Sequence, residues 1–227
     1  VLANLPNGRK IVMSVTKQAF VYTYDRLTGE PIWPIVERPV PAGDVPGEWY
    51  SPTQPFPTRP APFDRQGATE DNLIDFTPEL RAQALEIFNL YTTGPLFTPP
   101  SVRDESLGGT LGTIQLPGSQ GGADLEGASF DPETGLHYIP SITAPFVADL
   151  ELGDPEVTNL RYVKGARRWL GGPQGLPLFK PPYGRITAID MNTGDHLWMI
   201  PTGETPDRIK NNPALNGVDV GETGTGN

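Results

Sequence analysis

Residues 16–33, T-K-Q-A-F-V-Y-T-Y-D-R-L-T-G-E-P-I-W, have the pattern of a β-hairpin. Tyr22 and Tyr24 stand at alternate positions, as side chains on one face of a strand do. Asp25 can cap the turn that follows through its side chain, and Gly29 can take the positive φ that such a turn requires. We therefore expect a strand, a tight turn and an outgoing strand that ends near a tryptophan.

The same turn occurs three times in the chain. The sequence D-R-L-T-G-E-P-I-W covers residues 25–33, D-P-E-T-G-L-H-Y-I covers 131–139, and D-M-N-T-G-D-H-L-W covers 190–198. Trp33 and Trp198 occupy matching positions, which we expect on the outgoing strands. The repeats start 106 residues apart (131 − 25) and then 59 apart (190 − 131), whereas one propeller blade needs about 40–50 residues. The spacing predicts blades with insertions.

Two long segments separate the repeats. We interpret residues 33–100 as a loop and helix insertion and residues 144–183 as a second long connection of loop structure. The first is rich in proline, which cannot donate to a strand ladder, so we expect extended loops and no central strands there. Leaving large aromatic residues in water is unfavourable, which favours an ordered loop over a flexible linker. These residues are Trp49, Tyr50, Phe56 and Phe63.

One short helix is predicted inside the first insertion. Thr77 has the side chain of an N-cap, and Pro78 suits the first turn. Apolar residues then recur at helical spacing on one face; they are Leu80, Ala84, Ile87 and Tyr91. We expect Gly94 and Pro95 to end the helix.

Composition narrows the possible functions. The 227 residues include 26 Gly and 27 Pro, or 53 together, about twice ordinary usage, which indicates short strands joined by many turns. The chain has no cysteine, so disulfides and thiolate chemistry are excluded. Its net charge of −10 opposes binding to nucleic acid, and we expect no nucleic-acid partner. Because it begins at Val1 and ends in a Gly-rich tail, we expect a fragment or processed piece of a longer protein, or a trimmed one.

The ordered series of motifs resembles the quinoprotein dehydrogenases that depend on pyrroloquinoline quinone (PQQ), in particular the membrane-bound glucose dehydrogenase group. The segments that carry the resemblance are the first hairpin, G-P-L-F-T-P-P-S, G-T-I-Q-L-P-G-S-Q-G-G-A-D-L-E-G-A-S-F-D-P-E-T-G and P-P-Y-G-R-I-T-A-I-D-M-N-T-G-D-H-L-W. The resemblance covers nearly the whole chain. It implies an all-β fold over residues 1–227, a partial eight-bladed β-propeller of about three to four blades with tryptophan-docking repeats.

The resemblance also implies a catalytic and cofactor-binding role for Lys17. A lysine at this strand position in the family hydrogen-bonds the reactive quinone carbonyl. A cation suits that place because hydride transfer leaves negative charge on the oxygen. Spacing alone favours a solvated lysine at a strand end, and only the resemblance favours the role at the cofactor.

Two further cofactor-binding positions follow from the resemblance, Asp124 and Leu125. The family often has Asn-Trp there. Asp124 keeps an acceptor but lacks the amide donor, and it adds charge beside a cofactor with three carboxylates. The alternative for Asp124 is a turn cap before the next strand. We expect no metal ligands in this chain; the ligands of the Ca²⁺ ion that the resemblance implies should lie on other blades.

His137 and His196 follow two of the turns without a second ligand at metal spacing, so we expect them to be strand residues. The resemblance implies that the chain is part of a periplasmic dehydrogenase, attached to the inner membrane through a missing N-terminal segment, that oxidises a sugar or alcohol and reduces ubiquinone. The remaining blades or a second copy would complete its sheets. The alternative is a non-enzymatic propeller, a scaffold or binding module without the cofactor.

Overall fold

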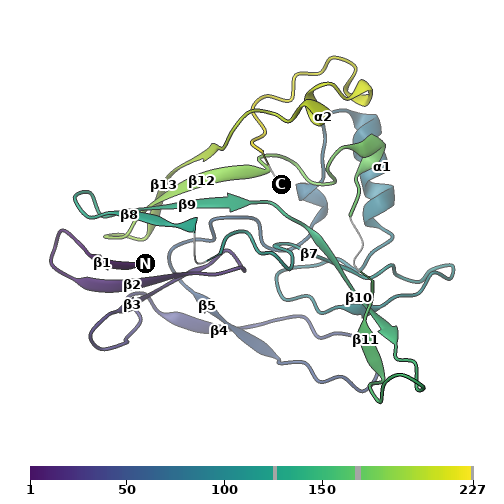
Figure 1. The fold of residues 1–227 in the computed structure, drawn as a ribbon, viewed down its shortest axis with the longest axis horizontal. Coiled ribbons are helices and arrows are strands. Elements are labelled where there is room, and N and C mark those ends of the chain that lie inside the picture. Colours follow the sequence, from purple (N-terminus) through teal and green to yellow (C-terminus); the bar gives the residue numbers. More distant parts are fainter. Residues whose placement is uncertain (125–126, 167–169, 226–227) are drawn as a thin grey trace.

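The computed structural model describes residues 1–124, 127–166 and 170–225 (Figure 1). One four-stranded sheet has the antiparallel order β13-β12-β9-β8. The four strands are β8 (Ser129–Asp131), β9 (Leu136–Ile142), β12 (Gly184–Asp190) and β13 (Asp195–Pro201). The second and third repeat turns join β8 to β9 and β12 to β13. The sheet therefore has the up-and-down order of a propeller blade.

A second sheet contains three antiparallel strands in chain order. They are β1 (Leu2–Asn4), β2 (Lys10–Val15) and β3 (Val21–Asp25). The first repeat turn follows β3, and a single bridge joins Tyr24 to Pro31 beyond it. Trp33 lies just after this bridge rather than on a strand, so the expected strand position is right for Trp198 on β13 and wrong for Trp33.

The two blade-like sheets pack face to face through one apolar cluster. Ile11 and Met13 of β2 meet Ile139 of β9 and Ile189 of β12, all of them at most 1% exposed. Trp33 packs against the same cluster. A Cβ atom on Gly194 would lie 2.9 Å from the Trp33 ring, so the tryptophan of the first repeat rests on the turn glycine of the third.

All three repeat turns have the predicted geometry. Asp25, Asp131 and Asp190 each accept a backbone N–H from two residues ahead through Oδ1, at 2.8–2.9 Å. The glycine four residues after each aspartate has a φ of +80° and donates its N–H to the aspartate carbonyl. A side chain at these positions would be strained, which explains why the glycine recurs.

The proline-rich insertion is ordered and forms a ribbon of two strands, β4 (Ile35–Pro39) and β5 (Thr53–Pro57). As expected for proline, neither strand joins a larger sheet. Phe63 is fully buried, but Trp49 is 81% exposed, so the expectation that the aromatic residues of this segment all avoid water is wrong for Trp49.

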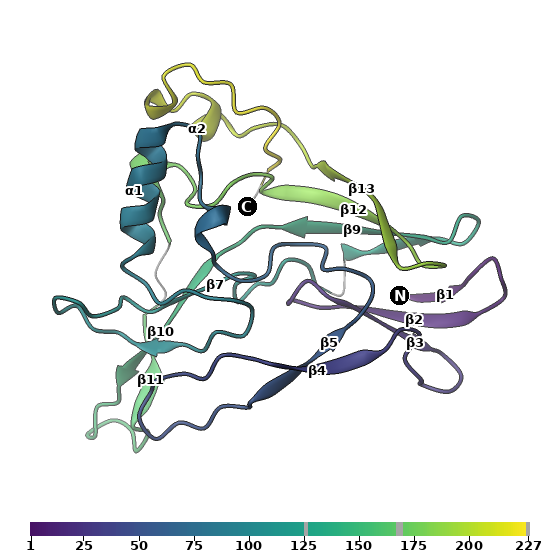
Figure 2. The same ribbon diagram turned by 180° about the vertical axis from the view of Figure 1, so that it is seen from behind.

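Helix α1 (Pro78–Phe88) begins as predicted, with the Thr77 side chain accepting the N–H of Leu80. It ends at Phe88, before the predicted stop at Gly94, because Leu90 and Tyr91 donate to carbonyls three residues back and tighten the last turn. A short helix, α2 (Asp207–Lys210), was not predicted. Both views show the two helices away from the β1–β3 sheet (Figures 1 and 2).

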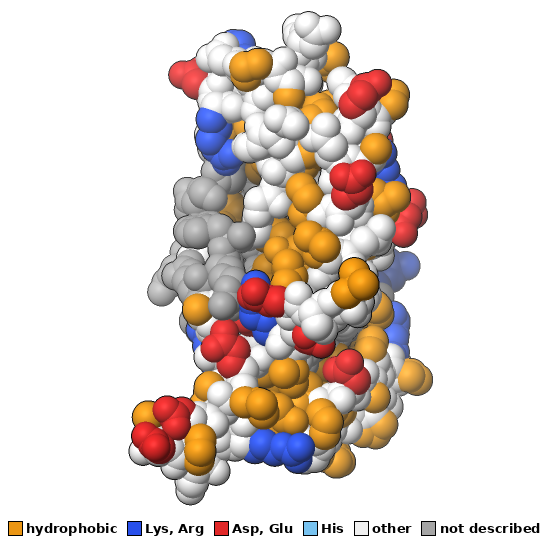
Figure 3. Space-filling model, turned by 90° about the vertical axis from the view of Figure 1, so that its right-hand side faces the viewer, with side chains coloured by type: hydrophobic (Ala, Val, Ile, Leu, Met, Phe, Trp, Pro, Cys, Tyr) orange, Lys and Arg blue, Asp and Glu red, His pale blue; other side chains and the backbone are white. Residues whose placement is uncertain are grey.

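The second connection is not all loop. It contains β10 (Phe146–Leu152) and β11 (Tyr162–Lys164), which pair with each other. β10 also pairs with β6 (Ser101–Val102) and β7 (Thr113–Gln115). The pattern F-V-A-D-L-E-L alternates in β10, with Val147 and Asp149 buried, but its glycine- and proline-rich surroundings obscured this signal. Figure 3 shows hydrophobic side chains gathered down the middle of the face that α1, β10 and β11 border.

A second apolar core lies under α1. Leu80, Ala84 and Phe88 of the helix pack with Leu116 and with the segment that precedes β12. In that segment Leu176, Leu178, Phe179 and Tyr183 are at most 4% exposed. This core therefore anchors the loops that surround the pockets described below.

Candidate functional site

Lys17 lies in the tight turn between β2 and β3, not on a strand. The turn is closed by hydrogen bonds from Thr16 N–H to the Phe20 carbonyl and from Ala19 N–H to the Thr16 carbonyl, both 3.0 Å. Ala19 is fully buried at a φ of +68°. The predicted strand position is therefore wrong by a few residues, because the buried Ala19 reverses the chain before the alternating strand begins.

The glycine-rich segment before Asp124 lies directly against this turn. Gly122 donates its N–H to the Lys17 carbonyl at 3.1 Å. Gly121 has a φ of +84°, and a Cβ atom there would lie 2.6 Å from Cβ and Cγ of Lys17. Only glycine allows the segment to pass this close, so the Gly121-Gly122 pair fixes where the lysine side chain starts.

The structure brings Lys17 and Asp124 together. The Lys17 ammonium lies 3.7 Å from Oδ2 of Asp124 and donates to the Ser119 carbonyl at 3.4 Å. Both side chains are about half exposed, 51% for Lys17 and 58% for Asp124. These contacts are longer than a good charged hydrogen bond of about 2.7–2.9 Å, so an anionic ligand could compete for the ammonium. Leu125, the third predicted position, lies outside the described residues.

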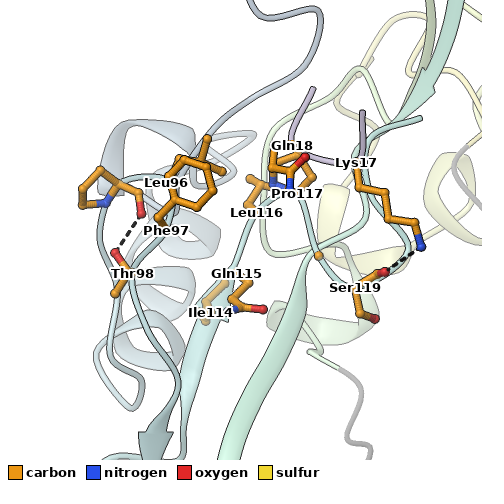
Figure 4. A pocket seen from close by; sticks show the side chains of 12 residues that line it. Lys17, Gln18, Leu96, Phe97, Thr98, Ile114, Gln115, Leu116, Pro117 and Ser119 are labelled. Carbon is orange, nitrogen blue, oxygen red and sulfur yellow. Dashed lines mark hydrogen bonds between the residues drawn. The ribbon is translucent and has the colours of Figure 1, made fainter. Parts of the chain in front are cut away.

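A pocket of about 270 Å³ opens beside Lys17. Figure 4 shows Lys17 on one side, with its ammonium turned toward Ser119, and Leu96 and Phe97 on the opposite side. Leu116 and Pro117 add apolar surface, and Gln18 adds an amide. The pocket thus combines flat apolar walls with one cation at its edge.

Sequence reasoning missed a buried ion pair behind this site. Arg185 on β12 contacts Oδ1 of Asp64 at 2.6 Å, and the two side chains are 3% and 0% exposed. Oδ1 of Asp64 also accepts the Arg65 N–H and the Thr143 hydroxyl. Burial raises the pKa of the Asp64 carboxyl, against the opposing effects of Arg185 and these hydrogen bonds.

Asp64 connects this pair to the Lys17 turn. Its Oδ2 atom would lie 3.1 Å from a Cβ atom on Gly122, and the preceding residue, Phe63, donates its N–H to the Ala19 carbonyl at 3.1 Å. Gly122 in turn accepts the N–H of Ile142 at the end of β9. The pair therefore lies under the segment that carries Asp124. No sequence signal indicated it, because Asp64 and Arg185 are 121 residues apart.

The described part of the chain contains no group of three or more His, Cys, Asp or Glu side chains that could hold a metal ion. His137 lies on β9 and His196 on β13, as predicted. His137 is fully buried, and burial lowers its pKa to about 4.

Among the described residues, no helix is long and apolar enough to cross a membrane.

Blade-like sheets with Asp-x-x-Thr-Gly turns at the ends of their strands define the chain as part of a β-propeller. Residues 1–227 match the family model described as "Glucose/ethanol/alcohol dehydrogenase, beta-propeller domain", and the chain belongs to this family of PQQ-dependent enzymes. The prediction of an all-β fold that forms part of a PQQ propeller is thereby confirmed, as is the resemblance to quinoprotein dehydrogenases.

Curated relatives include three dehydrogenases. The chain is 28% identical to the quinate/shikimate dehydrogenase (quinone) of Acinetobacter baylyi, over 85% of this chain and 25% of that protein. It is 28% identical to quinoprotein glucose dehydrogenase A of Acinetobacter calcoaceticus, over 93% and 28%. It is 31% identical to the glycerol dehydrogenase large subunit of Gluconobacter oxydans, over 83% and 28%. The chain thus spans about a quarter of the length of the relatives it matches.

Solved structures with a similar arrangement include a europium-containing methanol dehydrogenase. The similarity covers 88% of this chain and 27% of that one, at 17% identity and a TM-score of 0.41. A quinohemoprotein alcohol dehydrogenase from Comamonas testosteroni is similar over 88% and 23%, at 17% identity and a TM-score of 0.39.

Proposed function

We propose that the chain is part of a PQQ-dependent dehydrogenase that oxidises a sugar or an alcohol and passes the electrons to a quinone. The observation that carries this proposal is the Lys17 ammonium at the edge of a pocket with apolar walls, held by two long polar contacts. Family membership supports the same reading.

The residues of the pocket fit the chemistry of PQQ, a flat ring system with three carboxylates and two adjacent carbonyls. Leu96, Phe97 and Pro117 offer apolar surface for the rings, and Lys17 and Gln18 offer N–H donors for the oxygens. A volume of about 270 Å³ would hold part of such a molecule. Further walls would come from other parts of a longer protein.

Lys17 would act by electrostatic stabilisation. Bound PQQ supplies the two-electron acceptor that takes the hydrogen of the substrate C–H bond. The Lys17 ammonium would supply positive charge close to where a carbonyl oxygen of the bound cofactor would gain negative charge. The close approach of Gly121 to Cβ and Cγ of Lys17 fixes where this side chain starts.

Asp124 is not among the residues that line this pocket, and it would act through its contact with the Lys17 ammonium. The Asp124 carboxylate, 3.7 Å from the ammonium, would repel a cofactor that carries carboxylates of its own. We therefore propose that binding draws the Lys17 ammonium from Asp124 toward the quinone, or that a divalent cation offsets the negative charge of Asp124. The same ion pair favours the second candidate, a propeller scaffold that does not bind PQQ, because Asp124 already neutralises the lysine.

We further propose that other blades, or a second copy, cover the outer strand β13. Its residues Leu197, Trp198, Met199 and Ile200 are 40–54% exposed, so both faces of this edge strand present apolar side chains to water. Such an edge is a site for further packing. We also propose that the longer protein lies in the periplasm, is attached to the inner membrane and uses ubiquinone as its electron acceptor.

The test is a titration with PQQ in the presence of Ca²⁺, made on this chain and on the longer protein that contains it, and followed by absorbance and calorimetry. Lys17→Ala should weaken binding by about 10- to 100-fold, the value of a charged hydrogen bond. Lys10→Ala, which removes an exposed lysine from the other end of β2, is the control and should leave binding unchanged. If neither protein binds PQQ, the scaffold interpretation replaces the enzyme interpretation. If both variants bind PQQ equally well, the proposed role of Lys17 is wrong.

A further inference from the structure

The sequence contains two Asn-Gly pairs, Asn7-Gly8 and Asn216-Gly217. Both pairs are exposed and lie in turns. The first joins β1 to β2, and the second follows the 3₁₀ helix Pro213–Leu215. In such a pair the backbone nitrogen of the glycine can attack the side-chain amide carbon of the asparagine, because glycine has no side chain to block the approach. Both pairs therefore contain the groups for the same reaction.

The two glycines have almost the same surroundings. Gly8 has a φ of +84° and Gly217 a φ of +81°. A Cβ atom on either residue would meet no atom within 4 Å. Neither crowding nor the backbone conformation of the glycine therefore distinguishes the pairs, and a difference in reactivity has to come from their hydrogen bonds.

Hydrogen bonds hold both reacting groups of the first pair. The Gly8 N–H donates to the Leu5 carbonyl at 2.8 Å. The Asn7 side chain accepts the N–H of Arg9 through Oδ1 at 3.0 Å. The attack needs a nitrogen that can give up its proton and an amide carbon that can turn toward it, so both bonds have to break before the first pair can react.

The second pair lacks both of these bonds. Among the described residues, no group accepts the N–H of Gly217, and the Asn216 side chain makes no hydrogen bond. The neighbouring bond from Val218 N–H to the Leu215 carbonyl, at 2.9 Å, passes over the glycine. Asn216 has a φ of +48° and a ψ of +39°, a left-handed conformation that asparagine adopts more readily than most residues. The nitrogen and the amide carbon of this pair are therefore both unprotected.

We propose that Asn216 is a site of spontaneous deamidation, with water as the co-reactant. The Gly217 nitrogen bonds to Cγ of Asn216, the C–N bond of the side-chain amide breaks, and the nitrogen's proton leaves with the released ammonia. Water then opens the resulting cyclic imide at one of its two carbonyls. One opening gives aspartate, and the other gives isoaspartate, in which the backbone runs through the former side chain. No electrons are gained or lost.

The isoaspartate product would disturb the core under α1. It adds one carbon to the backbone between Leu215 and Val220, which both pack in that core. The same segment is bonded to α2, since the Asn212 N–H donates to the Ile209 carbonyl at 3.0 Å. Arg208 of α2 lines a second pocket, of about 510 Å³. Deamidation would therefore loosen one wall of this second pocket.

The experiment incubates the folded chain at mildly alkaline pH and follows both asparagines by peptide mapping with mass spectrometry. Because two hydrogen bonds protect Asn7, Asn216 should react at least about 5-fold faster. The same chain in concentrated urea is the matched control, since unfolding removes the protecting bonds and should make the two rates similar. Equal rates in the folded chain, a faster reaction at Asn7, or a ratio that urea leaves unchanged would overturn the proposal.

A second comparison tests the structural consequence. Asn216→Ser removes the reaction, and Asn216→Asp carries the charge of one product on a normal backbone. After incubation, the wild-type chain should contain a fraction with a lower Tm than its fresh sample, whereas neither variant should. If peptide mapping finds isoaspartate at this position and Tm is unchanged, the effect on the core is wrong. None of these measurements involves PQQ, so their outcome is independent of the proposed dehydrogenase function.

Discussion

Replacing Asp64 with asparagine tests whether the buried ion pair supports the Lys17 site. Asp64 and Arg185 are 0% and 3% exposed and lie 2.6 Å apart. Asp64→Asn keeps the size of the side chain but leaves the Arg185 guanidinium as a buried charge without its anion. We expect the folded state to lose stability and the Gly122 segment to shift, because the Asp64 side chain packs against Gly122.

The magnitude follows from burial. Breaking one partner of a buried pair typically costs about 3–5 kcal/mol, whereas an exposed pair contributes about 0–1 kcal/mol. For a chain of 227 residues, 1 kcal/mol corresponds to roughly 2–4 °C in Tm, so Asp64→Asn should lower Tm by roughly 6–20 °C. Replacing both partners, as Asp64→Asn with Arg185→Met, removes the uncompensated charge and should restore much of this loss.

The chain offers a matched control in the pair of Arg59 and Asp195. Its N–O distance is 2.9 Å, close to that of the buried pair, but its side chains are 51% and 60% exposed. Asp195→Asn should therefore change Tm by only a few degrees. Thermal and urea unfolding of the two variants, with a PQQ titration of each, measure both effects. Equal losses of stability for Asp64→Asn and Asp195→Asn would refute the reasoning from burial.

Three further predictions concern other parts of the molecule. Burial lowers the folded-state pKa of His137 to about 4, so the unfolded chain takes up a proton first as pH falls from about 6.5. The free energy of unfolding should therefore fall by about 3 kcal/mol between pH 7 and 4, and this contribution should be absent in His137→Leu. Gly121→Ala should weaken PQQ binding as much as Lys17→Ala does, whereas Gly108→Ala, at the same φ of +84° but with no atom within 4 Å of its Cβ, should not. Ile200→Lys on β13 should reduce self-association in sedimentation without lowering Tm, and a wild-type chain that is monomeric at all concentrations would contradict the second-copy packing.

Local rules predicted the repeat turns and the start of α1 well. The Asp-x-x-Thr-Gly turns depend on side-chain caps and on one glycine of positive φ, and both are encoded within five residues. The end of α1 was placed too late because bonds to carbonyls three residues back tighten its last turn. The strand β10 was missed because it depends on contacts with distant segments. β10, for example, pairs with β6 and β7, which lie more than 30 residues earlier.

The candidate site divides in the same way. The resemblance to a family indicated Lys17 and Asp124, and the structure places them 3.7 Å apart. The sequence pattern could not indicate Asp64 and Arg185, which lie behind them. An aspartate in a proline-rich loop and an arginine on a strand are each expected at the surface. Only the fold shows that both are buried.

The buried pair also explains why the insertion is ordered. Asp64 and Arg65 belong to the proline-rich segment, yet Asp64 bonds Arg185 of β12, and Arg65 donates to the carbonyls of Lys180 and Pro181 just before that strand. Phe63 adds a bond to the Lys17 turn. The insertion thus links the two blade-like sheets, and it contacts the Lys17 turn and the Gly122 segment between them. A change that loosens the insertion should therefore disturb the Lys17 pocket before it disturbs the apolar cores.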